Sequence, residues 1–197
     1  ASLNIGYIFV IIVYIKIISN FALWRITYMK NFIVIRSANE HDMDRILEIQ
    51  SKCFRQGYLE SRDSLFSKIL SSGDTCILAI AGTEIAGYFF SVEADFYEPP
   101  VFNSTRHILK RTPDCLYLHD LSVDPKFRGL GIGNLLLERL VEKAKEKALN
   151  RLSLIAIDGL VPYWTKNGFS VVTAIPQKLS DCLQSYGKSC TYMLRII

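Results

Sequence analysis

Short apolar runs recur along the chain, several of them alternating with polar residues. Runs of this length that are rich in Val, Ile, Tyr and Phe are typical of β-strands. The pattern predicts strands at residues 32–36, 75–81, 84–93, 115–123, 151–157, 169–173 and 191–197. Gly82 and Thr83 separate the second run from the third, which favours a hairpin there.

Other segments repeat apolar residues three or four positions apart. This spacing predicts helices at residues 42–54, 61–70, 131–149 and 161–166. The longest of them has one apolar face and an opposite face of Glu and Lys. Strands and helices in this order predict a mixed α/β sheet.

The first 28 residues differ from the rest, because residues 5–24 are almost entirely apolar apart from Lys16, Ser19 and Asn20. One interpretation is a membrane anchor, and another is an extra packed strand or helix. A third is that translation naturally begins at Met29, which makes residues 1–28 a non-native extension. We expect residues 29–197 to form the folded domain in each case.

Composition fits one such domain: the chain has 197 residues, of which 50% are hydrophobic and 21% charged. A net charge of +4 without a basic run predicts no nucleic-acid partner. The five cysteines form no C-x-x-C pair and the chain has no histidine cluster. They predict reduced thiols in a cytoplasmic protein and no metal site.

The most informative segment is residues 118–137, where a predicted strand enters a glycine-rich turn that opens into the long helix. Glycines allow a close approach, and the first N–H groups of a helix are unpaired and favour an anion. Arg128 supplies a cation for that anion. A dinucleotide fingerprint would need glycine where Asn134 stands, and the Gly-Lys-Ser/Thr end of a P-loop is absent.

The spacing Arg-x-x-Gly-x-Gly from Arg128 to Gly133, after Leu-Ser-Val-Asp-Pro, closely resembles the acetyl-CoA pyrophosphate loop of the GNAT N-acetyltransferase superfamily. Residues 32–49, 85–91 and 163–169 are similar to other parts of that domain. The resemblance covers about residues 30–197. Residues 99–103 and 185–193 resemble a bacterial subgroup of unknown substrate.

This resemblance implies an α/β fold with a mixed, mostly antiparallel central sheet and helices on both faces. It also implies a V-shaped splay between the fourth and fifth strands. Acetyl-CoA is the implied co-substrate. The implied contacts are Leu121, Ser122, Val123, Arg128, Gly129, Leu130, Gly131, Ile132, Gly133 and Asn134.

His119 is the candidate base, because histidine titrates near neutrality and can accept a proton from an ammonium substrate. Strand alternation predicts that Tyr117, His119, Leu121 and Val123 share one face, and that Leu118, Asp120 and Ser122 share the other. Asp120 is the competing candidate. A histidine that only packs in the sheet is the alternative to both.

Family members usually place a tyrosine near the CoA sulfur, but the matching residue here is Trp164, which cannot donate a proton in that role. Tyr163, Tyr192 or water then substitutes as the acid, or no acid is used. Trp164 is expected to pack in the core.

The acceptor is expected to be a primary amine of a small molecule, near Tyr117, Glu93, Phe96 and Tyr97, where carboxylates and aromatic rings suit a cation. Two other functions stay open: a non-catalytic acyl-CoA-binding regulatory domain, and protein N-terminal acetylation. A homodimer of this chain is a further open alternative.

Overall fold

The computed structural model describes residues 32–106, 112–157, 159–187 and 189–197. The proposed extension at residues 1–28 and Met29 therefore lie outside the described residues. Within the described ranges, no helix has the length and apolar character needed to cross a membrane.

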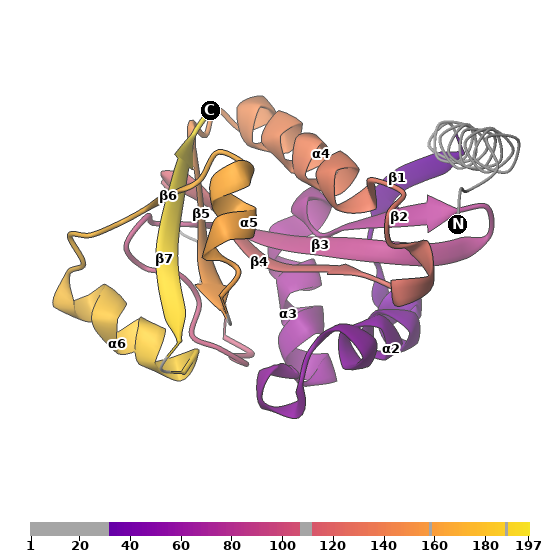
Figure 1. The fold of residues 1–197 in the computed structure, drawn as a ribbon, viewed down its shortest axis with the longest axis horizontal. Helices are drawn as coiled ribbons and strands as arrows, with labels where there is room; N and C mark the ends of the chain where they lie inside the picture. The colour runs from indigo at the N-terminus through magenta and orange to yellow at the C-terminus, as the bar shows by residue number, and fades with distance from the viewer. Residues whose placement is uncertain (1–31, 107–111, 158, 188) are drawn as a thin grey trace, which may run out of the picture.

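Seven strands form one sheet in the order β1-β2-β3-β4-β5-β7-β6 (Figure 1). Their bounds are β1 (Ile33–Ser37), β2 (Ile77–Ala81), β3 (Glu84–Ala94), β4 (Cys115–Val123), β5 (Arg151–Ile157), β6 (Ser170–Val171) and β7 (Cys190–Ile196). Among the strands of the described residues, only β4 and β5 pair in parallel, and the other neighbours are antiparallel. The predicted mixed, mostly antiparallel sheet is confirmed.

Helices cover both faces of this sheet, as predicted. On one face, α4 (Ile132–Glu146) and α5 (Val161–Lys166) pack on a core that includes Leu116, Leu118 and Leu154. On the other face lie α2 (Met43–Cys53), α3 (Arg62–Ser72) and α6 (Gln177–Ser185). The Ser61 side chain accepts a hydrogen bond from the Ser64 N–H and so caps α3.

The sequence pattern did not predict α6, which has few apolar residues. Leu179 and Cys182 are buried against the sheet and hold this helix in place. The Phe102 N–H donates to Ser185 Oγ at 3.1 Å, and Tyr186 Oη donates to the Pro100 carbonyl at 2.8 Å. The two segments that resemble a bacterial subgroup therefore contact each other.

Strands β4 and β5 separate part of the way along their length. They pair only from Leu116↔Leu152 to Leu118↔Leu154. Beyond this point each strand continues without the other, and in Figure 1 the half of the sheet with β5 and β7 runs in a clearly different direction from the half with β3 and β4. This opening confirms the V-shaped splay between the fourth and fifth strands.

A β-bulge in β4 corrects the predicted alternation. Phe90 pairs with Asp120 and Ser91 pairs with Leu118, so His119 is an extra residue. A bulge shifts the alternation of side chains by one position. Leu121 therefore packs on the same core as Leu118, and the prediction that Tyr117, His119, Leu121 and Val123 share a face is wrong.

Candidate functional site

Asp124 fixes the start of the glycine-rich loop. Its carboxylate accepts hydrogen bonds from the Lys126 N–H at 3.0 Å, from Arg45 at 2.6 Å and from Lys52 at 3.2 Å. Burial opposes ionisation of Asp124, but these donors outweigh it and lower the pKa to about 2. The end of β4 is thus tied to α2 before the chain reaches Arg128.

The loop then adopts a backbone that only glycine accommodates easily. Gly129 has φ 81° and Gly131, the N-cap of α4, has φ 77°. A Cβ added at either would meet no protein atom within 4 Å, so both face open space. The N–H groups of Ile132 and Gly133 precede the first helical bond, from Leu135 to Gly131, and have no acceptor within the helix.

This end of the opening suits an anion. The N-terminus of the 15-residue helix α4 carries partial positive charge, and the exposed Arg128 is next to it. Asn134 is exposed and Leu130 half-buried in the same segment. The residues expected to hold the CoA pyrophosphate therefore lie together at a helix N-terminus, which can bind a phosphate group.

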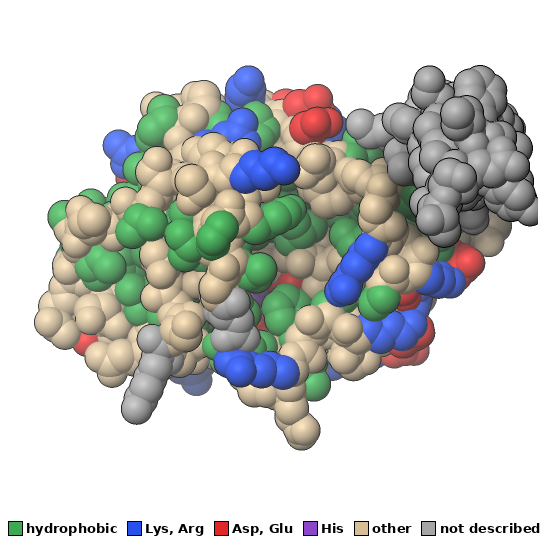
Figure 2. Space-filling model, viewed as in Figure 1, with side chains coloured by type: hydrophobic (Ala, Val, Ile, Leu, Met, Phe, Trp, Pro, Cys, Tyr) green, Lys and Arg blue, Asp and Glu red, His purple; other side chains and the backbone are tan. Residues whose placement is uncertain are grey.

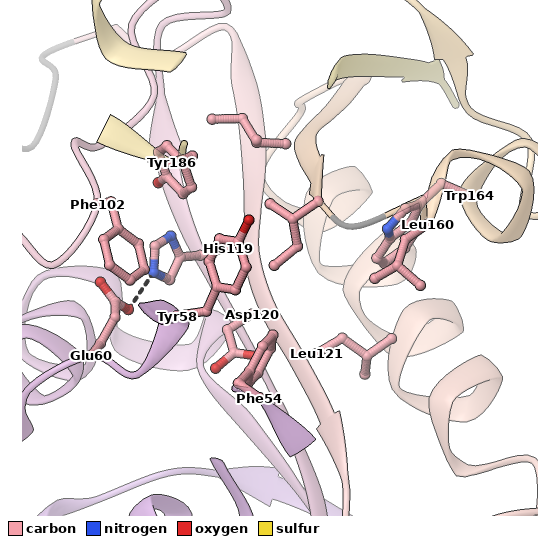
Figure 3. Close-up of a pocket in the computed structure, with 12 residues that line it drawn as sticks. Phe54, Tyr58, Glu60, Phe102, His119, Asp120, Leu121, Leu160, Trp164 and Tyr186 are labelled. Carbon is pink, nitrogen blue, oxygen red and sulfur yellow. Dashed lines mark hydrogen bonds and ion pairs between the residues drawn. The ribbon is translucent and has the colours of Figure 1, made fainter. Parts of the chain in front are cut away.

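At the other end of the opening lies a cavity of about 80 Å³ (Figure 3). Its lining residues come from segments far apart in the sequence. They are Phe54, Tyr58, Glu60, Phe102, His119, Asp120, Leu121, Ile155, Ile157, Leu160, Trp164 and Tyr186. Figure 2 shows, in the view of Figure 1, hydrophobic side chains over the region between α5 and the middle of the sheet, with Lys and Arg around it.

His119 and Glu60 form the closest polar contact in this cavity. His119 Nε2 lies 2.5 Å from Glu60 Oε2, and the two side chains are 3% and 4% exposed. Burial lowers the pKa of His119 below its ordinary value of 6.5; the charge of Lys68 acts in the same direction and Glu60 opposes both. A histidine with a lowered pKa is neutral at pH 7 and can accept a proton.

Asp120 lies beside His119 but has its own partners. Its carboxylate accepts hydrogen bonds from Tyr88 Oη at 2.6 Å and from Ser122 Oγ at 3.1 Å. Burial, aided by the negative charge of Glu60, raises the pKa of Asp120 to about 7. Both predicted base candidates are therefore in one cavity, each with a perturbed pKa.

Trp164 lines the cavity from α5 and is 8% exposed. Its indole packs against the rings of Phe89 and Phe169, with centroid distances of 6.2 and 5.4 Å. The expected packing role of Trp164 is confirmed.

The two tyrosines proposed as acids lie outside the cavity lining. Tyr163 is on α5 with its hydroxyl close to Gly133, 3.4 Å from where a Cβ would stand, so it is next to the loop. Burial raises the pKa of Tyr163. Tyr192 is fully buried, and its hydroxyl donates to the carbonyl of Phe96.

The predicted acceptor residues also lie apart from this lining. Glu93 pairs with Lys147 at 2.8 Å, and Phe96 packs against Tyr97 and the buried Tyr192. Tyr117 is buried behind His119, with ring centroids 5.9 Å apart.

Sequence reasoning missed several lining residues, above all Glu60. It lies just before the predicted helix at residues 61–70, where an acidic residue is ordinary and gives no sign of burial. Four other lining residues carry only a general apolar signal in the sequence, because they lie in connecting segments or at the end of the unpredicted α6. They are Phe54, Tyr58, Phe102 and Tyr186.

A splayed α/β sheet, with a glycine-rich loop before a helix N-terminus at one end of the splay and a cavity at the other, is the arrangement expected of an acyltransferase-type fold. A model of the acetyltransferase (GNAT) family matches residues 43–169. The chain belongs to this family.

Among curated proteins, the chain is 30% identical over 136 residues to the uncharacterised N-acetyltransferase YkwB of Bacillus subtilis (strain 168). That match covers 61% of this chain and 58% of YkwB. The chain is also 29% identical over 75 residues to the thialysine N-epsilon-acetyltransferase of Bos taurus, which covers 38% of this chain and 40% of that protein. The chain thus spans between two fifths and three fifths of the length of these relatives.

Solved structures share the fold at low identity. The GphF GNAT-like decarboxylase in complex with isobutyryl-CoA superposes with a TM-score of 0.68 at 16% identity, covering 83% of this chain and 98% of that one. Ard1 from Thermoplasma volcanium superposes with a TM-score of 0.63 at 15% identity, covering 84% and 98%.

Proposed function

We propose that this protein is an N-acetyltransferase that moves the acetyl group of acetyl-CoA directly to the primary amine of a small molecule. The observation that carries the proposal is the opening between β4 and β5. A glycine-rich loop at the N-terminus of α4 lies at one end, and a cavity with His119 and Asp120 lies at the other. The names of the two curated relatives, both N-acetyltransferases, support it.

Each part of the opening has a task in this reaction. The free N–H groups of the loop and Arg128 bind the pyrophosphate of acetyl-CoA, the co-substrate. The backbone of β4 that β5 leaves unpaired, Leu121 to Val123, hydrogen-bonds the pantetheine arm and stabilises the oxyanion. His119 removes the proton from the amine, which must be neutral to attack.

Water or the departing thiolate completes the proton transfer in this scheme. A thiol with a pKa of ~8.5 leaves as a thiolate without a strong acid. The buried Trp164 in the position of the usual tyrosine fits a reaction without a protein acid. Tyr163 then donates no proton in the reaction and lies at the loop end, next to Gly133.

The experiment is a panel of small primary amines and of peptides with free α-amines, each incubated with acetyl-CoA. Free thiol is measured with a thiol reagent and the acetylated product by mass spectrometry. We expect a small amine to be acetylated with one thiol released per product. Acetyl-CoA binding with no thiol release for any acceptor would favour a regulatory domain, and acetylation of peptides alone would favour protein N-terminal acetylation.

A further inference from the structure

Glu60 is a buried carboxylate that the reaction scheme does not use. Its backbone is fixed by Gln50 of α2, whose Oε1 accepts from the Glu60 N–H at 2.5 Å and whose Nε2 donates to the Glu60 carbonyl at 3.3 Å. The side chain of Glu60 points from this anchored position toward the His119 ring (Figure 3). Gln50 of α2 therefore fixes the backbone position from which the carboxylate reaches His119.

The carboxylate oxygen remote from His119 is already occupied. Glu60 Oε1 accepts from the Asn103 N–H at 2.7 Å, from Ser64 Oγ at 3.0 Å and from Lys68 Nζ at 3.2 Å. Burial raises the pKa of the Glu60 carboxyl, but the interactions with His119, Lys68 and the Asn103 amide outweigh it and hold the pKa well below its ordinary value. Glu60 is therefore an anion. Of the partners named here, only His119 contacts its Oε2.

This anion decides which nitrogen of His119 carries the proton. An ionised carboxylate can only accept, so His119 Nε2 must donate. In a neutral imidazole the other nitrogen, Nδ1, then has a free lone pair. Among the residues that the structure describes, His119 Nδ1 is the one buried side-chain nitrogen or oxygen without a hydrogen-bond partner.

We propose that Glu60 is a positioning residue that holds His119 with Nε2 protonated and Nδ1 free to accept a proton. In Figure 3 Nδ1 lies on the side of the ring turned away from Glu60, toward Tyr186, which also lines the cavity. The role of Nδ1 as the base rests on the proposed acetyl transfer, whereas the tautomer does not.

The proton balance of the step is complete. The acceptor ammonium gives one proton to Nδ1, and the resulting imidazolium keeps its Nε2–H bond to the Glu60 anion. The amine nitrogen forms a bond to the thioester carbonyl carbon, and the C–S bond breaks. The second amine proton goes to the thiolate, directly or through water, and gives the free thiol of CoA.

The variant Glu60→Gln tests the proposed tautomer directly. The three groups that donate to Oε1 need an acceptor, so the amide oxygen of Gln takes that position. The amide nitrogen then takes the place of Oε2 and donates to His119 Nε2, which moves the histidine proton to Nδ1. The substitution thus inverts the tautomer while it changes little in shape. The double variant with Lys68→Met keeps the buried charge balanced and serves if the single variant does not fold.

The tautomer is measured on the wild-type protein and both variants by ¹⁵N NMR of the imidazole ring, with His119→Gln to assign the signal among three histidines. We expect a protonated Nε2 in the wild type and a protonated Nδ1 in the variants. A protonated Nδ1 in the wild type, or an unchanged tautomer in the folded variants, would overturn the proposal.

Kinetics on the same proteins add the functional readout. We expect kcat to fall by about 10²-fold or more in the variants, with the acetyl-CoA Kd within about twofold of the wild type. The control Glu146→Gln neutralises a surface carboxylate, paired with Arg139 and Lys143, and should change neither quantity. An inverted tautomer with unchanged kcat and pH profile would refute Nδ1 as the base and point to Asp120. If the wild type acetylates no amine, the proposed function fails while the spectra still decide the tautomer.

Discussion

The two ends of the opening between β4 and β5 are built from different chemical groups. The loop end consists of consecutive residues, 128–134, and offers backbone N–H groups and the exposed Arg128. The cavity end consists of side chains from segments as distant as Glu60 and Tyr186, and all of them except Leu160 are buried or half-buried. A phosphate can be bound by local backbone geometry alone, whereas control of a proton needs groups that only the tertiary fold brings together.

The largest effect should come from the cavity end. His119→Gln should lower kcat by roughly 10²–10⁴-fold and leave acetyl-CoA affinity nearly intact, because the loss is confined to proton transfer. In the wild type the rate should rise with pH as His119 loses its proton, with a midpoint below 6.5 because burial lowers its pKa. Steady-state rates from pH 5 to 9 check both points.

The same profile separates the two base candidates. Asp120 would give a midpoint of about 7, the value to which burial raises its pKa. A rise near pH 7 that persists in His119→Gln would assign the proton transfer to Asp120 instead.

Lys68→Met should lower the free energy of unfolding strongly, because it breaks a buried ion pair. Lys68 Nζ is buried against Glu60 and Ser64, and breaking a buried ion pair by removal of one partner costs about 3–5 kcal/mol. Urea unfolding followed by circular dichroism measures this loss. The matched control Lys178→Met breaks the pair between the exposed Lys178 and the half-buried Glu98 and should cost at most about 1 kcal/mol. Equal losses for the two variants would mean that the buried network contributes nothing special.

At the loop end, Arg128→Ala should weaken acetyl-CoA binding by about 1.5–3 kcal/mol, since it removes a charge-assisted contact. Gly131→Val should weaken it further, because a side chain at φ 77° is strained and enters the open space of the cradle. Titration calorimetry gives the affinities, with the exposed Arg62→Ala as the control. Wild-type affinity in both loop variants would contradict the assignment of the loop.

Trp164→Phe should have the smallest effect on catalysis, with kcat within about threefold of the wild type, because the indole packs and donates no proton in the reaction. Tyr163→Phe should lower kcat only if its hydroxyl protonates the thiolate. Initial rates at saturating acetyl-CoA are the measurement. A loss of 10²-fold in Trp164→Phe would reveal a role beyond packing.

The features that could be predicted from the sequence follow the same division between the loop end and the cavity end. The bounds of β4, β5 and α5 were predicted as the structure has them, because their apolar patterns end at clear turns. The glycine loop was predictable because its residues are contiguous. Glu60 was not, since its burial depends on remote partners, Lys68 and Asn103.

The bulge and α6 could not be predicted from the sequence for other physical reasons. The alternation argument assumes an unbroken period of two, and nothing in the apolar pattern of β4 marks the extra residue. Helix α6 has only Leu179, Cys182 and Leu183 as its apolar stripe, and it is defined by what it packs on.

The bulge also shows how the candidate base is accommodated in a packed sheet. If His119 is left out of the count, β4 reads as a regular strand, with Leu118 and Leu121 toward α4 and Asp120 toward the opposite layer. His119 is therefore an added residue whose presence leaves the inside and outside assignment of every other β4 side chain unchanged. The chemistry of the cavity and the packing of the core are separable here, so a change of one residue at this position can alter the reaction without a redesign of the fold.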